Sequence, residues 1–229
     1  MESEEEFLSI SSLICEPARV KMLWNLLDGR AYTASELSVA ADISATSASN
    51  HLNKLLEADI IKVEAQGRHR YYAFSRPDVA YVVESLASLA NHNHSNKEKQ
   101  TSTKGIRFCR TCYDHLAGMI GVRVTEAMEQ KNLIMKTGTI YTVSTKGWKW
   151  LAQFDISKDD FTTNRRPLTR QCLDWSERRP HLAGLLGAIL LQRMLERKWF
   201  RKIQFSRELI VTAKGAKELY NLLDVNINS

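Results

Sequence analysis

Cysteine and histidine residues gather at two places in the second half of the chain. Cys109, Cys112 and His115 follow one another at intervals of three residues, which would align them as one stripe on a helix. Cys172 and His181 lie further along the chain and could complete a set of four ligands if the two segments face each other. Thiolate and imidazole ligands suit a soft or borderline metal ion, so these residues are candidate metal ligands.

Other interpretations of these residues stay open. Small thiols commonly fill contacts between helices, which would make the cysteines core residues. A redox role for Cys109 and Cys112 is an alternative, although neither a disulfide nor a low thiol pKa can be recognised from sequence. An organic effector is another, since four tryptophans could either line an apolar pocket or belong to the core: Trp148, Trp150, Trp175 and Trp199.

A different chemistry is predicted for a helix that follows Ser44, whose hydroxyl is a suitable N-terminal cap. Its apolar stripe consists of Ala48, Leu52, Leu55 and Leu56. The opposite face and its margins carry small polar side chains or histidine: Thr46, Ser47, Asn50 and Asn53 on the face, with Ser49 and His51 at the margins. Asn can bind adenine through two hydrogen bonds, and Ser or Thr can bond to any base edge, so this surface could read a major groove of DNA.

The elements around this helix support that interpretation. A short helix over residues 36–41, a turn at 41–44 and the polar helix are typical of a helix-turn-helix. Two β-prone runs around Gly67 then predict a hairpin, where Arg68 and Arg70 could reach phosphate or the minor groove. A polar helix face alone is most simply a solvated surface. The conjunction of cap, turn, helix and basic hairpin favours DNA binding.

Amphipathic helices are also expected at both ends of this first unit. One covers residues 7–14, and the other begins at Pro77. The second has a wider apolar face than one small core requires, formed by Val79, Val82, Val83, Leu86 and Leu89. The surplus predicts a partner helix, most simply from a second copy of the chain.

The chain is expected to contain two domains. Residues 91–104 include no large apolar residue, which predicts a polar linker between a domain at 1–90 and another at 105–229. The second domain contains an internal repeat, since the His-Leu-Ala-Gly of 115–118 recurs at 181–184. We expect two helix–hairpin–helix copies, at about 105–165 and 166–229. The predicted fold class is α+β and mostly helical, with a winged helix-turn-helix followed by this duplicated domain.

Net charge gives little support to nucleic-acid binding. The chain carries +6 overall, but residues 1–94 hold 8 Lys and Arg against 13 Asp and Glu, whereas residues 105–229 hold 21 against 12. The basic excess therefore lies outside the predicted DNA-binding domain, either as solvated surface or as extra phosphate contacts. An acidic start, four cysteines and no apolar run of about 18 residues predict a cytoplasmic protein with no membrane partner.

Residues 8–90 resemble the ArsR (SmtB-like) family of winged-helix repressors. The resemblance is carried by the Ser-Asn-His-Leu of residues 49–52 and by Gly67-Arg68 in the hairpin. It implies a homodimer, formed largely by the first and last helices of the domain, that binds an inverted-repeat operator in double-stranded DNA and represses until an inducer arrives. Residues 111–118 and 172–181 resemble the extra C-terminal domain of the longer members, which implies no particular activity.

The sequence departs from the metal-sensing members of that family. There is no thiol within residues 37–41 and no His near Ala80, where their ligands would fall. We therefore expect a non-enzymatic repressor whose effector, a metal ion, a thiol oxidant or an organic ligand, is sensed in the C-terminal domain; no cofactor follows from the sequence itself.

Two rival hypotheses remain. One is a DNA-anchored enzyme with a nucleophile–base pair at Cys112/His115 or Cys172/His181, although no nucleophile elbow, phosphate loop or acidic metal triad occurs in the sequence. The other is a structural DNA-binding protein without an effector.

Overall fold

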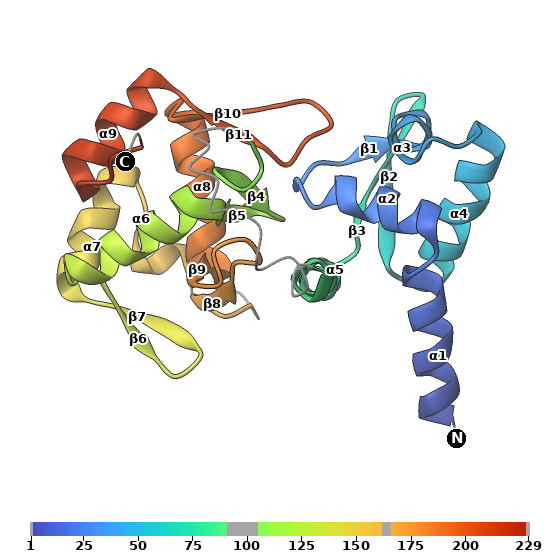
Figure 1. The fold of residues 1–229 in the computed structure, drawn as a ribbon, viewed down its shortest axis with the longest axis horizontal. Helices are drawn as coiled ribbons and strands as arrows, with labels where there is room; N and C mark the ends of the chain where they lie inside the picture. The colour runs from blue at the N-terminus through green and yellow to red at the C-terminus, as the bar shows by residue number, and fades with distance from the viewer. Residues whose placement is uncertain (1, 91–104, 162–165, 228–229) are drawn as a thin grey trace. The chain divides into compact units, whose positions relative to one another are not determined.

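The computed structural model describes residues 2–161 and 166–227 apart from 91–104 (Figure 1). It divides into two compact units, Met1–Leu89 and Ala90–Ser229, which are considered separately below. The predicted linker at 91–104 lies outside the described residues. Within the described ranges, no helix is both long enough and apolar enough to cross a membrane.

The first unit is a winged helix-turn-helix, as predicted. Its elements in chain order are α1 (Glu2–Ile14), α2 (Pro17–Leu26), β1 (Tyr32–Thr33), α3 (Ala34–Ala41), α4 (Ala45–Glu57), β2 (Ile61–Gln66), β3 (His69–Phe74) and α5 (Pro77–Ala90). The three strands form an antiparallel sheet in the order β1-β3-β2. Leu23, Leu37 and Leu52, from α2, α3 and α4, are fully buried where these helices pack together.

Local hydrogen bonds set the helix-turn-helix. Thr33 and Glu36 form a capping box at the start of α3, in which each side chain accepts a hydrogen bond from the other residue's backbone N–H. Asp42 adopts a left-handed conformation, with φ 57°, and ends the helix. The Ser44 hydroxyl then accepts a hydrogen bond from the Ser47 N–H and caps α4. The predicted cap at Ser44 is confirmed.

The wing is a tight hairpin. The pairing of Gln66 with His69 leaves only Gly67 and Arg68 in the turn between β2 and β3. Gly67 has φ +60°, a conformation that costs glycine little because it lacks a Cβ. The turn holds both Arg68 and Arg70 at the exposed end of the hairpin.

The second unit repeats one order of elements twice. The first series is β4 (Arg110–Cys112), β5 (His115–Ala117), α6 (Gly118–Gln130), β6 (Ile134–Thr137), β7 (Ile140–Val143) and α7 (Thr145–Leu151). Two short 3-10 turns follow, η2 (Ala152–Phe154) and η3 (Lys158–Phe161). The second series is β8 (Arg170–Leu173), β9 (Pro180–Ala183), α8 (Gly184–Glu196), β10 (Phe200–Lys202), β11 (Leu209–Val211) and α9 (Ala213–Leu223). Each series therefore reads hairpin, helix, hairpin, helix.

The predicted helix around Cys109, Cys112 and His115 is wrong. These residues lie in and beside the β4–β5 hairpin, which turns through Tyr113 and Asp114. Tyr113 has φ 60°, which a continuing α-helix does not permit. The three-residue interval therefore reflects a hairpin with a two-residue turn, and α6 begins only at Gly118.

In each series, the first helix packs on a strand of the other series. α6 of the first series contacts β9 of the second, α8 of the second contacts β5 of the first, and β5 contacts β9 (Figure 1). Trp150, Trp175 and Trp199 are buried, so these three belong to the interior, while Trp148 packs against the same core. Gly187 on α8 allows a close approach, because a Cβ there would lie 3.2 Å from the His115 Cβ and closer still to the Leu182 backbone.

We predict that Thr33→Ala lowers the local stability of α3 by about 1 kcal/mol, since it removes the capping side chain. Thr33→Ser, which keeps the hydroxyl, is the matched control. Amide hydrogen exchange over residues 34–41 in the full chain measures the effect. Equal exchange rates in the two variants would show that the capping box does not stabilise this helix.

Candidate functional site

The predicted DNA-reading residues lie on the exposed side of α4. Ala48, Leu52 and Leu55 are completely buried against the rest of the unit. On the other side, Ser47 is half-buried and four polar side chains are exposed: Thr46, Ser49, Asn50 and Asn53. The helix thus presents hydroxyl and amide groups near its N-terminal end, where the backbone dipole favours an approaching phosphate.

His51 is held differently from its neighbours. It is half-buried, and its Nδ1 lies 3.4 Å from the Glu16 Oε2 and 3.3 Å from the Arg19 Nη1. Burial opposes ionisation of Glu16, but backbone N–H groups at the start of α2, together with the charges of His51 and Arg19, lower the pKa of this carboxyl group. His51 therefore links α4 to the start of α2.

The two wing arginines are exposed cations. Among the described residues, neither Arg68 nor Arg70 forms an ion pair, whereas Arg76 in the same unit pairs with Asp59 and Asp78. The Arg70 guanidinium lies 6.0 Å from the centre of the Tyr72 ring. The positive charge at the wing is therefore available to a phosphate backbone.

In the second unit, Cys112, His115, Cys172 and His181 come together. One ligand atom from each residue lies within 4.8 Å of the corresponding atom of every other residue. Cys112 pairs directly with His115 across the β4–β5 hairpin, and Cys172 pairs with His181 across β8–β9. Each hairpin thus places one thiol beside one imidazole, and the two hairpins face each other. We call these four residues the Cys/His cluster.

The geometry of the Cys/His cluster is compact and largely closed to solvent. The two Sγ atoms are 3.8 Å apart, and both cysteines are free thiols. The Nε2 atoms of His115 and His181 are 3.1 Å apart. Cys112, His115 and His181 are completely buried, and Cys172 is half-buried.

Each histidine has a carboxylate near its other nitrogen, within hydrogen-bond geometry at His115 but not at His181. The His115 Nδ1 lies 3.1 Å from the Asp114 Oδ1, and the His181 Nδ1 lies 3.4 Å from the Asp174 Oδ2. Each carboxylate in turn pairs with an arginine from the opposite series: Asp114 with Arg166 and Asp174 with Arg110. These four supporting residues were not predicted from the sequence. A pattern could have identified the two aspartates, because Asp114 and Asp174 each lie two residues after a cysteine of the cluster.

Electrostatics favour positive charge in this region. Burial disfavours a charged imidazole, but the thiolate of Cys112 and the carboxylate of Asp114 outweigh it and raise the pKa of His115 to about 9. Burial also opposes ionisation of Asp174, yet Arg110, His181 and hydrogen bonds from Ser176 and Gly118 hold the pKa of that carboxyl far below its usual value.

Cys109 does not belong to the cluster, contrary to its grouping with Cys112 and His115. It is completely buried in the hydrophobic core beside residues such as Phe108 and Leu116. Burial raises the pKa of its thiol far above the usual value, which makes it a poor metal ligand and a poor nucleophile.

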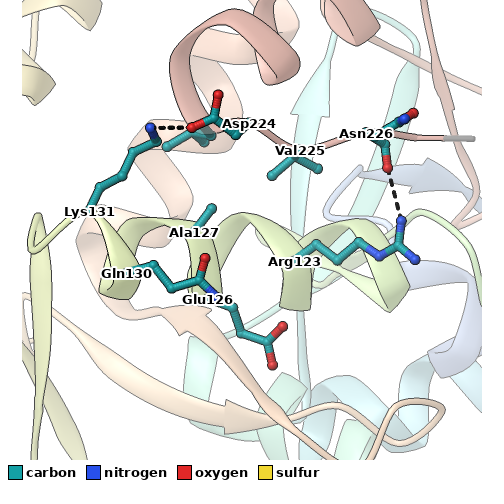
Figure 2. Close-up of a pocket in the computed structure, with 9 residues that line it drawn as sticks. Arg123, Glu126, Ala127, Gln130, Lys131, Asp224, Val225 and Asn226 are labelled. Atoms are coloured by element: carbon teal, nitrogen blue, oxygen red, sulfur yellow. Dashed lines mark hydrogen bonds and ion pairs between the residues drawn. The ribbon is translucent and has the colours of Figure 1, made fainter. Parts of the chain in front are cut away.

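A separate polar pocket of about 460 Å³ lies between α6 and the segment that follows α9 (Figure 2). The Arg123 guanidinium donates a hydrogen bond to the Asn226 carbonyl at one side, and Lys131 pairs with Asp224 at the other. The tryptophans do not line it. This pocket is therefore not the apolar effector pocket considered from the sequence.

Known proteins are similar to this chain over part or nearly all of its length. A family model described as a helix-turn-helix domain matches residues 15–64. The uncharacterized HTH-type transcriptional regulator YdfF of Bacillus subtilis (strain 168) is 40% identical over 219 residues, which cover 95% of this chain and 97% of YdfF. Two solved structures are also similar.

One is reduced HlyU from Vibrio cholerae, at 22% identity, 38% coverage of this chain, 92% of that chain and a TM-score of 0.35. The other is the homodimeric winged helix-turn-helix domain of Mb0332 from Mycobacterium bovis, a possible ArsR-family regulator. It is 18% identical, and the match covers 42% of this chain and 91% of that chain with a TM-score of 0.38. Identity to YdfF at 40% over nearly the full length of both chains shows that this chain belongs to the HTH-type transcriptional regulators.

Proposed function

We propose that this regulator is a homodimeric repressor that binds an inverted-repeat operator and is released by an effector acting in the C-terminal unit. The exposed polar face of α4, together with the unpaired arginines of the wing, carries the DNA-binding part of the proposal. Asn50 and Ser47 would contact base edges, and Arg68 and Arg70 would contact phosphate or the minor groove.

The dimer is supported by apolar side chains left on the surface of α1 and α5. Phe7 and Leu8 on α1 are 69% and 59% exposed, and Val82 and Leu89 on α5 are 52% and 68% exposed. Apolar residues concentrated on two helices of a small unit favour burial against a second copy. A dimer would also place two recognition helices to read the two halves of an inverted repeat.

An effector site in the C-terminal unit is supported by the Cys/His cluster. Burying polar groups costs free energy, so such a cluster is not expected where side chains serve only to fill the core. An enzyme is less well supported, because Cys112 and His115 are completely buried and a nucleophile must reach its substrate. The similar order of elements in the two series also leads us to infer that this unit arose by internal duplication.

Ser47→Ala combined with Asn50→Ala tests the recognition surface. We expect this double variant to lose about 1–3 kcal/mol of its binding preference for the operator over other DNA, because base-edge hydrogen bonds are removed. The matched control makes the same two changes outside the helix-turn-helix, as Ser157→Ala with Asn25→Ala. Footprinting on genomic fragments identifies the operator, and titration of that fragment measures affinity. Unchanged operator affinity in the double variant would rule out this surface as the reader, and sequence-independent protection would rule out a repressor of specific sites.

Phe7→Glu combined with Leu89→Glu tests the dimer. Placing carboxylates on the exposed apolar side chains of α1 and α5 should shift the protein from dimer to monomer and weaken operator binding. Val39→Glu is the control, since Val39 is 77% exposed on α3, away from these helices. Sedimentation equilibrium provides the readout. A double variant that remains dimeric would contradict the assigned interface.

The effector is tested by measuring operator affinity of the full chain as purified, after chelation and after mild thiol oxidation. Coupling between distinct sites is usually worth about 1–3 kcal/mol, so we expect one treatment to change operator affinity by roughly 5-fold to 150-fold. Cys15→Ser serves as the control for oxidation of the exposed thiol in the first unit. An affinity that stays constant through both treatments would favour a DNA-binding protein without a metal- or thiol-based effector.

A further inference from the structure

We propose that Cys112, His115, Cys172 and His181 bind one divalent cation of the zinc class, with Asp114 and Asp174 orienting the two histidines. The proposal identifies the chemical class of effector at the site assigned above. Only its regulatory consequence rests on the proposed function, since metal binding itself requires no DNA.

The thiol–thiol and imidazole–imidazole distances within the Cys/His cluster suit a tetrahedral ion. With zinc–sulfur bonds of about 2.3 Å, tetrahedral geometry separates two thiolates by about 3.8 Å. The Sγ atoms of Cys112 and Cys172 are 3.8 Å apart. Zinc–nitrogen bonds of about 2.0–2.1 Å place two imidazole nitrogens roughly 3.4 Å apart, and the Nε2 atoms of His115 and His181 are 3.1 Å apart.

The hydrogen-bonding positions of the two histidines give an independent argument. The Asp114 Oδ1 lies within hydrogen-bond distance of the His115 Nδ1, at 3.1 Å, and the Asp174 Oδ2 lies 3.4 Å from the His181 Nδ1. The Nε2 atoms of the two rings therefore face each other, 3.1 Å apart, at a place where one shared proton or one metal ion can lie between them. A metal ion would replace that proton, and two thiols at the same place supply the remaining ligands of a soft site.

The arrangement also balances charge in a buried place. A divalent cation with two thiolates and two neutral imidazoles has no net charge, and each supporting aspartate already has an arginine partner. All four coordination positions are filled by protein, which is typical of structural or sensing zinc sites, whereas catalytic sites leave one position open.

Packing of small thiols is the main alternative explanation, and it does not account for the histidines. Thiols can fill an apolar contact without polar partners, as Cys109 does in the core of the same unit. The cluster instead brings two imidazoles into contact, each backed by a carboxylate. Because the ligands come equally from the two hairpins, a bound ion would connect the two series of elements.

Metal analysis of the full chain, without DNA, tests the proposal. We expect one zinc per chain after purification without chelator, and a lower melting temperature after the metal is removed. Cobalt added to the metal-free protein should give the visible bands of a tetrahedral ion and a near-ultraviolet thiolate-to-cobalt transition. Alkylation followed by mass spectrometry should show that zinc protects Cys172, which is the half-buried thiol of the pair. This last measurement uses the unaltered chain and does not depend on whether a variant folds.

Variants separate ligands from other thiols. Cys112→Ser with Cys172→Ser should abolish the thiolate-to-cobalt transition, while Cys15→Ser should leave it unchanged. Asp114→Asn should weaken zinc binding by roughly 10-fold to 100-fold through misorientation of His115, as loss of an outer-shell carboxylate commonly does. Asp155→Asn, which removes an exposed carboxylate paired with Arg197, is its control.

Three results would overturn the proposal. They are a native chain with no bound metal and no cobalt spectrum, a Cys112–Cys172 disulfide in the purified protein, and retention of one tightly bound metal by the double cysteine variant. Since every readout is taken without DNA, failure of the metal site is distinguishable from failure of the proposed repressor, which is judged by footprinting and operator titration.

Discussion

The C-terminal unit depends on one buried carboxylate, Asp174. Its Oδ2 accepts hydrogen bonds from Arg110 at 2.9 Å and from the Gly118 N–H at 2.7 Å, while its Oδ1 accepts from the Ser176 hydroxyl and backbone. Burying two opposite charges costs several kcal/mol per ion, so such a pair persists only where the remaining hydrogen-bonding positions are satisfied. Both oxygens of Asp174 meet that condition, and they connect the second hairpin to the start of α6 and lie beside His181, whose Nδ1 is 3.4 Å away.

The helix-turn-helix could be predicted from sequence because its determinants are local. Ser44 caps α4, Pro77 begins α5, and the apolar stripe of α4 follows helical spacing, so each element is encoded within a few residues. The wing was similarly accessible, since the two-residue turn at Gly67 has a recognisable composition. The exposed face of α4 then follows from geometry once its buried face is known.

The C-terminal unit could be predicted only in part, because its organisation depends on contacts distant in sequence. The repeat of His-Leu-Ala-Gly was visible, but the hairpin before each helix was not. Three-residue spacing at Cys109, Cys112 and His115 is compatible with a helix, and only the left-handed Tyr113 and the pairing across the strands exclude it. The sequence suggested Cys172 and His181 as partners for Cys112 and His115 only on the condition that the two segments face each other. The arginines and aspartates that support them come from opposite series, and no local pattern connects Arg110 to Asp174.

The exchange of helices between the two series has a consequence for biosynthesis. As the chain leaves the ribosome, the residues of the first unit emerge before those of the second, and Met1–Leu89 form a compact unit. The β4–β5 hairpin is completed later, because α8, which packs on β5 together with α6, lies about seventy residues downstream. Until α8 is made, that hairpin lacks part of its cover. Synthesis therefore produces a nascent chain whose DNA-reading part can be complete while its C-terminal part is still open.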